Sequence, residues 1–205
     1  MNRLQKFDAQ FNSVLIGIDE AGRGPLAGPV VAAAVCAGPE CYAFFEDVDD
    51  SKKLTEKQRE KIFARIVESK IPFCAGFASS EEIDGINILQ ATFLAMRRAA
   101  QKFYNLPGAR VLVDGNRRIN NFPLPQMTVV DGDAKSFSVA MASVIAKVCR
   151  DRYMKVIDGM YPRYGFAGHK GYGCAAHISA INQYGPCREH RKTFGPVKNL
   201  ELFHE

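Results

Sequence analysis

Acidic side chains stand at the ends of two apolar stretches of this sequence. Residues 13–20 (SVLIGIDE) end in Asp19 and Glu20, and residues 110–114 (RVLVD) end in Asp114. A carboxylate next to a buried strand is costly unless its charge is compensated, and two such strand ends side by side would also repel each other. A hard divalent cation such as Mg²⁺ prefers carboxylate oxygens and relieves both costs. The pattern therefore predicts a metal site at these three acids.

Divalent ions held by carboxylates suit the hydrolysis of a phosphodiester. Two such ions, about 3.5–4 Å apart, can clamp the attacking and the leaving oxygens. A fourth acid could come from Asp131 or Asp133, which both precede a predicted helix, where either could instead serve as a cap. The residues alone leave this choice open. Asp151 lies within that helix between two arginines, which favours a structural ion pair.

Because Glu20 directly follows Asp19, the two side chains can share one site only if the strand has a suitable geometry. Adjacent residues of a strand point to opposite faces of a sheet, so Asp19 and Glu20 would normally diverge. We expect the strand to bend or bulge after Gly17, because the flanking glycines permit it and both side chains could then reach one site.

Basic and glycine-rich segments supply candidate contacts to a polyanion. Residues 22–24 (Gly-Arg-Gly) let the backbone approach a ligand closely beside a cation. Residues 51–53 (Ser-Lys-Lys) place a hydroxyl, ammonium groups and amides near a helix start, which suits phosphate. Residues 169–173 (HKGYG) carry a cation and an aromatic ring that could stack on a base or sugar. Each segment can also be explained by structure alone, as a turn, a solvated helix end or a side chain that fills part of the core.

The charge distribution agrees with a polyanionic substrate. The chain has 205 residues and a net charge of +5, and in residues 135–198 Lys and Arg outnumber acids by 11 to 3. A basic segment beside an acidic cluster suits a nucleic acid that is held and then cut, although a solvated basic face explains such a bias equally well. The six cysteines form no C-x-x-C pair, so we expect reduced thiols, and the histidines show no zinc-ligand spacing.

No apolar run approaches ~18 residues, and the first residues lack an apolar signal core. We therefore expect a cytoplasmic protein with no membrane segment. From the chain size and the absence of an obvious interface helix we expect a monomer.

The elements that must position these residues follow from the periodicity of the chain. The short turn between the first two strands favours an antiparallel hairpin. Thr55 and Gln58 have the spacing of a capping box, and Ser80 could cap the next helix. Strand–helix alternation after three early strands predicts a mixed sheet with helices packed on it. The predicted strands are 13–20, 29–37, 72–78, 110–114 and 127–130, the predicted helices are 55–69, 88–103, 136–160 and 175–183, and residues 162–173 and the tail after 185 are predicted to be irregular.

Several segments together resemble bacterial ribonuclease HII, a type 2 ribonuclease H. They run in order over nearly the whole chain, and the first and the sixth are highly specific. The segments are IGIDEAGRGPLAGPVVAAAV (16–35), DSKKL (50–54), EEIDGINILQATFLAM (81–96), VLVDGN (111–116), GDAKSFSVAMASVIAKVCRD (132–151), YPRYGFAGHKGYG (161–173) and HRKTFGPV (190–197).

The resemblance implies an α/β protein with a ribonuclease H-like fold, a mixed five-stranded sheet flanked by helices and a small helical C-terminal part. It implies one catalytic domain over residues 1–205, with a core to about 160 and a substrate-contacting segment after it. The implied activity is hydrolysis of the RNA strand of RNA–DNA hybrids and incision 5′ of single ribonucleotides in duplex DNA. Products would carry a 3′-hydroxyl and a 5′-phosphate. The implied cofactor is Mg²⁺ or Mn²⁺, with two ions at the site.

The resemblance also assigns residues. The four catalytic acids are Asp19, Glu20, Asp114 and Asp133, of which the first three hold metal. Asp133 is preferred to Asp131 because the family's acid follows a glycine, here Gly132. Residues implied to contact substrate are the junction sensor Gly22, Arg23 and Gly24, the sugar-recognising Tyr172, and the phosphate contacts Ser51, Lys52, Ser143, Lys147 and Lys170.

The sequence departs from the family pattern at two positions. Met141 replaces a usual alanine within the long helix, and Asp131 stands where a lysine is frequent, which adds negative charge near the metals. Two rival functions remain at this point. One is a nuclease of the same fold that needs longer hybrid tracts, and the other is a nucleic-acid binding module without activity.

Overall fold

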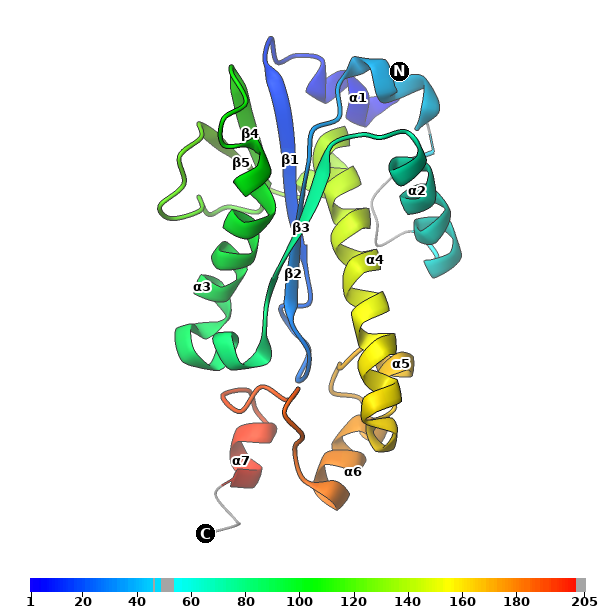
Figure 1. Cartoon of the computed structure of the whole chain (residues 1–205), viewed down its shortest axis with the longest axis vertical. Coiled ribbons are helices and arrows are strands. Elements are labelled where there is room, and N and C mark those ends of the chain that lie inside the picture. The colour runs from blue at the N-terminus through cyan, green and yellow to red at the C-terminus, as the bar shows by residue number, and fades with distance from the viewer. Residues whose placement is uncertain (46, 49–53, 202–205) are drawn as a thin grey trace.

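The computed structural model describes residues 1–45, 47–48 and 54–201, and a five-stranded sheet in the order β3-β2-β1-β4-β5 lies at its centre (Figure 1). β1 pairs antiparallel with β2 and parallel with β4, and the outer strands β3 and β5 pair antiparallel with β2 and parallel with β4. The predicted mixed sheet and hairpin are confirmed. The strands are β1 (Val14–Ala21), β2 (Val30–Val35), β3 (Phe73–Ala78), β4 (Ala109–Asp114) and β5 (Gln126–Val129).

Helices cover both faces of the sheet. α4 (Phe137–Met160) packs on β1 and β2 from one face, and α3 (Ser80–Ala100) packs on β2 and β3 from the other, so the sheet stands between them in Figure 1. Among the described residues no helix is both long and apolar enough to cross a membrane. The remaining helices are α1 (Arg3–Asp8), η1 (Pro39–Phe44), α2 (Glu56–Glu68), η2 (Gln101–Phe103), η3 (Gly132–Ala134), η4 (Pro162–Tyr164), α5 (Phe166–His169), α6 (Ala175–Tyr184) and α7 (Val197–Glu201).

The alternation of residues along β1 sets which side chain meets which helix. Ile16 and Ile18 are fully buried in the core on the α3 side. Gly17 points to the other face, where a Cβ atom would lie only 2.1 Å from the backbone carbon of Ser138 in α4. Successive residues point to opposite faces, so Asp19 faces α4 and Glu20 faces α3. Gly17 thus lets the long helix lie directly against the strand that carries the acids.

Capping side chains define the helix starts. The predicted box at Thr55 and Gln58 is confirmed, whereas α3 is capped by Ser79 instead of the predicted Ser80. α3 is interrupted at Asn87, whose left-handed backbone (φ 65°) ends the first segment. The Asn87 side chain accepts hydrogen bonds from the next helical amides, so the part after it is capped anew, where the sequence predicts the main body of the helix.

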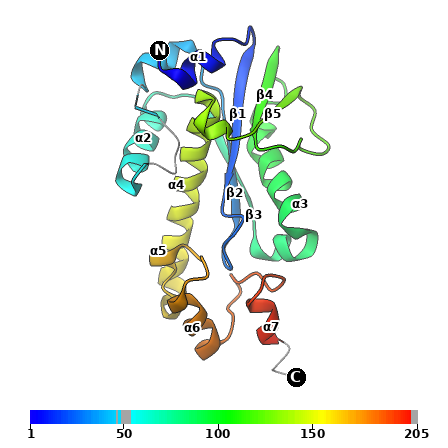
Figure 2. The ribbon, with the colours of Figure 1, turned by 180° about the vertical axis from the view of Figure 1, so that it is seen from behind.

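The C-terminal segment lies at the end of the sheet where β1 ends, as Figures 1 and 2 show from opposite sides. It is more regular than predicted, because α5 lies in the expected loop and α7 in the expected irregular tail. Backbone hydrogen bonds join it to the turn after β1. Leu26 N–H donates to the carbonyl of Gly171 at 2.8 Å, and Arg191 N–H donates to the carbonyl of Leu26 at 2.8 Å.

The close contact at Gly17 makes a testable prediction. Gly17→Ala would force α4 away from β1, so we expect the free energy of unfolding to fall by about 1–3 kcal/mol, as in other overpacked cores. Urea unfolding measures this value. Gly159→Ala is the matched control, because a Cβ at this helical glycine meets nothing within 4 Å. Equal stability of the Gly17 variant and wild type would contradict the packing account.

Candidate active site

One cavity of about 370 Å³, at the end of the sheet where β1 and β4 finish, is lined by three predicted acids, Asp19, Glu20 and Asp114. The pairing of β1 with β4 ends at Ile18 and Val113, so the acids follow directly after the last paired residues of two parallel strands. The other residues that line this cavity, called the carboxylate cavity below, are Ala21, Gly22, Arg59, Ser143, Lys147, Arg150 and Tyr172.

Of the bend or bulge predicted in β1 after Gly17, the bulge is wrong. The antiparallel register between β1 and β2 is unbroken from Gly17 to Ala21, and Gly17 serves the packing of α4. Glu20 nevertheless reaches the carboxylate cavity, because β4 has ended and leaves that side of β1 without a paired neighbour. Glu20 and Asp114 also line an adjoining cavity of about 100 Å³ on the α3 side. Glu20 therefore approaches the end of β4 from the face opposite to Asp19.

Burial and like charge act together on the acids. Asp19 is 4% exposed, and burial first, then the charges of Glu20 and Asp114, raise its pKa well above the ordinary carboxyl value. Burial also raises the pKa of Glu20, against the opposing charge of Arg23, whose Nη1 lies 3.3 Å from Glu20 Oε1. The ionised forms are thus destabilised by the surroundings that the fold provides.

Hydrogen bonds fix the orientation of these carboxylates. The Glu20 amide donates to Asp19 Oδ1 at 2.7 Å, and Ser143 of α4 provides a further side-chain hydrogen bond to Asp19. The amide of Gly132 donates to Asp114 Oδ1 at 2.6 Å. Within the described part of the chain, no three Asp, Glu, His or Cys side chains converge as a preformed metal site. The feature of these acids that suits metal is the chemistry of their oxygen donors.

Cations surround the acids. Lys147 Nζ pairs with Asp151 Oδ1 at 2.7 Å, one helical turn further along α4. Arg59 of α2 lies 3.8 Å from the other oxygen of Asp151, so the structural ion pair expected for Asp151 is confirmed. This pairing holds Lys147 and Arg59 at the wall of the carboxylate cavity, where a phosphate could approach them.

Two buried arginines, which the sequence analysis missed, hold the turn after β1. Arg191 is fully buried and donates to the carbonyls of Gly22, Arg23 and Gly28 at 2.5–3.0 Å. Arg150 donates to the carbonyls of Ala27, Pro29 and Lys170 at 3.0–3.1 Å. Burial lowers the pKa of both guanidinium groups, and these carbonyls offset the lost hydration. Only contacts distant in sequence reveal these roles.

The arginine contacts also orient the turn. The peptide group is planar and trans, so its N–H points opposite to its carbonyl. With the carbonyls of Gly22 and Arg23 directed at Arg191, the amides of Arg23 and Gly24 face away from it. Gly22 adopts a positive φ of 96°, and a Cβ there would overlap the Arg150 side chain at 1.9 Å. A side chain at position 22 would therefore disturb the turn.

The remaining predicted residues fall in different places. Tyr172 is 49% exposed, lines the carboxylate cavity, and its ring is 3.9 Å from the Cβ position of Gly24. Asp133 is buried in η3 and is not one of the described residues lining that cavity, so its role stays a prediction. Lys170 donates to the carbonyl of Ala167 and also lies outside the lining. The predicted contacts Ser51 and Lys52 lie outside the described residues.

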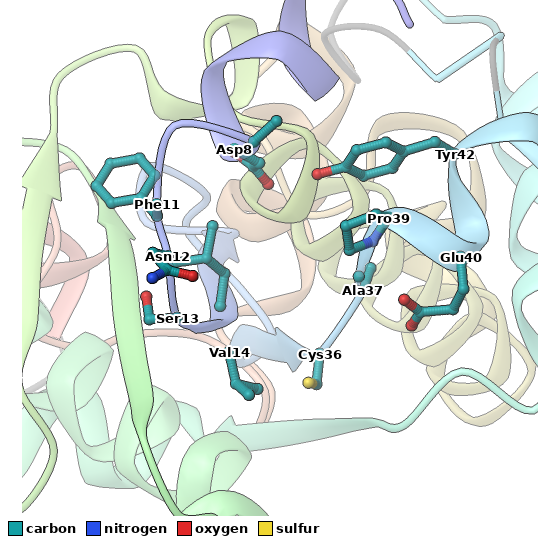
Figure 3. A pocket seen from close by; sticks show the side chains of 13 residues that line it. Asp8, Phe11, Asn12, Ser13, Val14, Cys36, Ala37, Pro39, Glu40 and Tyr42 are labelled. Carbon is teal, nitrogen blue, oxygen red and sulfur yellow. The ribbon is translucent and has the colours of Figure 1, made fainter.

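A larger cavity of about 530 Å³ lies at the opposite end of β1 (Figure 3). Asp8, Ser13, Glu40 and Tyr42 are among its lining residues. Asp8 Oδ2 accepts a hydrogen bond from the amide of Ser138 at 2.8 Å, so this buried acid stabilises the start of α4. None of the residues predicted to act in catalysis lines this cavity.

Comparison with known proteins decides the family. The family model described as Ribonuclease HII matches residues 16–196. The chain belongs to the ribonuclease HII family. Ribonuclease HII of Syntrophotalea carbinolica is 51% identical over 95% of this chain and 91% of its own. Ribonuclease HII of Fusobacterium nucleatum is 50% identical over 94% and 90%.

Solved structures agree with this assignment. Ribonuclease H2 of Pyrococcus horikoshii OT3 has a TM-score of 0.71 and 26% identity, over 92% of this chain and 97% of that one. Bst-RNase HIII in complex with Mn²⁺ has a TM-score of 0.77 over 99% and 74%, and at 19% identity it shows the fold alone. The predicted ribonuclease H-like fold is confirmed. As a member of this family, the protein is an endoribonuclease and a hydrolase.

The raised pKa of Asp19 predicts how metal-free protein responds to pH. When a carboxyl group has a higher pKa in the folded protein than in the unfolded chain, the folded protein loses stability as the pH rises through the folded pKa. In the presence of chelator, Asp19→Asn should therefore melt at a higher temperature than wild type at about pH 8. At about pH 4, near the unfolded carboxyl value, the difference should nearly vanish. Thermal denaturation at both pH values measures it, and a variant that is less stable at both would contradict the electrostatic account.

Proposed function

We propose that this protein hydrolyses the RNA strand of RNA–DNA hybrids and incises duplex DNA 5′ of single embedded ribonucleotides. The observation that carries the proposal is that Asp19, Glu20 and Asp114 line one cavity together with Gly22 and Tyr172. This arrangement puts groups that suit phosphodiester hydrolysis beside groups that suit recognition of a sugar. Family membership supports the same reading.

The donor set fits divalent metal, because its oxygens are hard ligands and its negative charges repel one another in a buried site. We propose that Asp19, Glu20 and Asp114 hold Mg²⁺ or Mn²⁺, two ions in the active complex, with Asp133 as the fourth acid. Bound metal would lower the pKa of a water that attacks the phosphate and would stabilise the leaving 3′-oxygen. The products are a 3′-hydroxyl and a 5′-phosphate.

The chain's own residues bind and orient the substrate. Lys147 and Arg59 lie beside the acids and attract the phosphate backbone. The amides of Arg23 and Gly24, which face away from Arg191, donate to the 2′-hydroxyl oxygen, the atom that distinguishes RNA from DNA. Tyr172 packs against the following deoxyribose, where a second 2′-hydroxyl would clash. We infer that this pair of contacts selects an RNA-to-DNA junction.

The proposal extends to phosphate contacts by Ser51, Lys52, Ser143 and Lys170, and to residues 161–205 as the segment that holds the duplex. The basic charge of this segment supports that role. The monomeric state and the cytoplasmic location expected from the sequence stay predictions.

Removing the central acid tests the catalytic role. Asp19→Asn keeps the size of the side chain but removes its charge, so we expect cleavage of a duplex with one ribonucleotide to fall by at least about 10³-fold while binding persists. Single-turnover cleavage and a binding titration measure the two effects. Asp131→Asn is the control. Asp131 is exposed, so this variant should keep most of the wild-type activity. Normal cleavage by the Asp19 variant would contradict the proposed role of Asp19 as a metal ligand.

Removing the aromatic ring tests recognition. Tyr172→Ala should lower kcat/KM at a single ribonucleotide by about 10-fold or more, the value of one stacking contact, with a smaller loss of duplex affinity. Tyr184→Ala removes a comparably exposed tyrosine outside the carboxylate cavity and should have little effect. Equal losses in affinity and cleavage would mean that Tyr172 contributes to packing alone and does not recognise the substrate sugar.

A further inference from the structure

Three histidines gather beneath the turn that carries Tyr172. His169 and His177 stack with ring centroids 4.3 Å apart, and His177 and His190 lie 5.2 Å apart. His177 and His190 are 0% and 1% exposed. Tyr164 and Phe166 pack against these rings, so water has little access to them. Burial lowers the pKa of His177, and it lowers that of His190 to about 4, so both are neutral at physiological pH.

Hydrogen bonds fix the tautomer of each buried ring. The amide of Cys187 donates to His190 Nδ1 at 2.9 Å, so Nδ1 carries a lone pair and the proton of the neutral ring is on Nε2. His190 Nε2 lies 3.1 Å from His177 Nε2, which must then accept. The proton of His177 is therefore on Nδ1, which lies 2.9 Å from the carbonyl oxygen of Tyr172 and donates to it.

The two histidines thus form a directed relay, defined here as Cys187 N–H to His190 to His177 to the Tyr172 carbonyl. His169 holds the peptide group between Lys170 and Gly171, because the amide of Gly171 donates to His169 Nδ1 at 3.1 Å. A second proton on His177 would meet the N–H of His190. His190 Nδ1 also lies 3.3 Å from the carbonyl oxygen of Cys187, but the carbonyl of Tyr172 requires the proton of His177 on Nδ1, so His190 keeps its proton on Nε2. The relay therefore has only one arrangement while both rings are neutral.

We propose that His177, held in one tautomer by His190, is a positioning residue that sets the place of Tyr172 and so contributes to junction specificity. The inference rests on the proposed function of Tyr172. The backbone on either side of the exposed ring is anchored by imidazoles, while the ring itself stays open to a substrate sugar. The relay spans residues from three separate parts of the C-terminal segment, so it couples the fold of that segment to the recognition site.

Two amide substitutions separate the positioning hydrogen bond from simple packing. In His177→Asn, the Nδ2 group can take the place of the ring Nδ1 and still donate to Tyr172. In His177→Gln, the amide lies where Nε2 stands, so contact with His190 is kept and the bond to Tyr172 is lost. Both variants remove a ring from the same buried site, so their melting temperatures should fall by similar amounts.

The measurement is kcat/KM on a duplex with one embedded ribonucleotide relative to a long RNA–DNA hybrid. We expect this ratio to fall by about three- to tenfold in the Gln variant, the worth of one hydrogen bond, and to stay near wild type in the Asn variant. On a Tyr172→Ala background the two variants should be equal. Equal ratios for Asn and Gln beside wild-type Tyr172 would overturn the positioning role while leaving the proposed function intact.

Imidazole ¹⁵N NMR tests the relay without activity. Wild-type protein should show His177 protonated on Nδ1 and His190 protonated on Nε2, and opposite tautomers would overturn the relay directly. If the wild-type enzyme did not cleave a duplex with one embedded ribonucleotide, the proposed function would fail, and with it the specificity role of His177.

Discussion

Two parallel strands that end side by side bring three carboxylates to one end of the sheet, where their like charges repel one another. The burial of Asp19, and then repulsion from Glu20 and Asp114, raise the pKa of that acid. The fold tolerates this arrangement because the rest of the sheet is strongly held. α4 lies directly on β1 at Gly17, and α3 covers the other face. The unfavourable charge is concentrated where a cation and a phosphate can relieve it.

In the proposed function, the C-terminal segment makes the site beside these acids selective. Arg150 and Arg191 are buried among backbone carbonyls of the turn after β1, and the histidines anchor the turn that carries Tyr172. Both turns are therefore fixed mainly by buried side chains. We infer that recognition depends on rigid backbone geometry, and that the exposed groups of the site are few because most polar groups nearby serve to hold it in place.

Much of this could be predicted from local sequence patterns. Apolar runs that end in acid gave the strands and three of the acids that meet, and the Thr55 box marked a helix start. The bulge expected in β1 was mispredicted, because a pattern along one strand does not reveal where its neighbour ends. The role of Arg191 depends on partners 163–169 residues away, and that of His177 depends on His190, 13 residues away, as well as on the nearby Tyr172, so no local pattern reveals them. Residues 1–8 carry too weak a periodicity to have predicted α1.

The central claim is that the carboxylates act only with a divalent cation between them. The most direct test is cleavage of a duplex that contains one ribonucleotide, with wild-type protein in Mg²⁺, in Mn²⁺ and in excess chelator. The account predicts incision 5′ of the ribonucleotide with either metal, a 3′-hydroxyl on the upstream product, and no incision in chelator. Undiminished cleavage in chelator would contradict it.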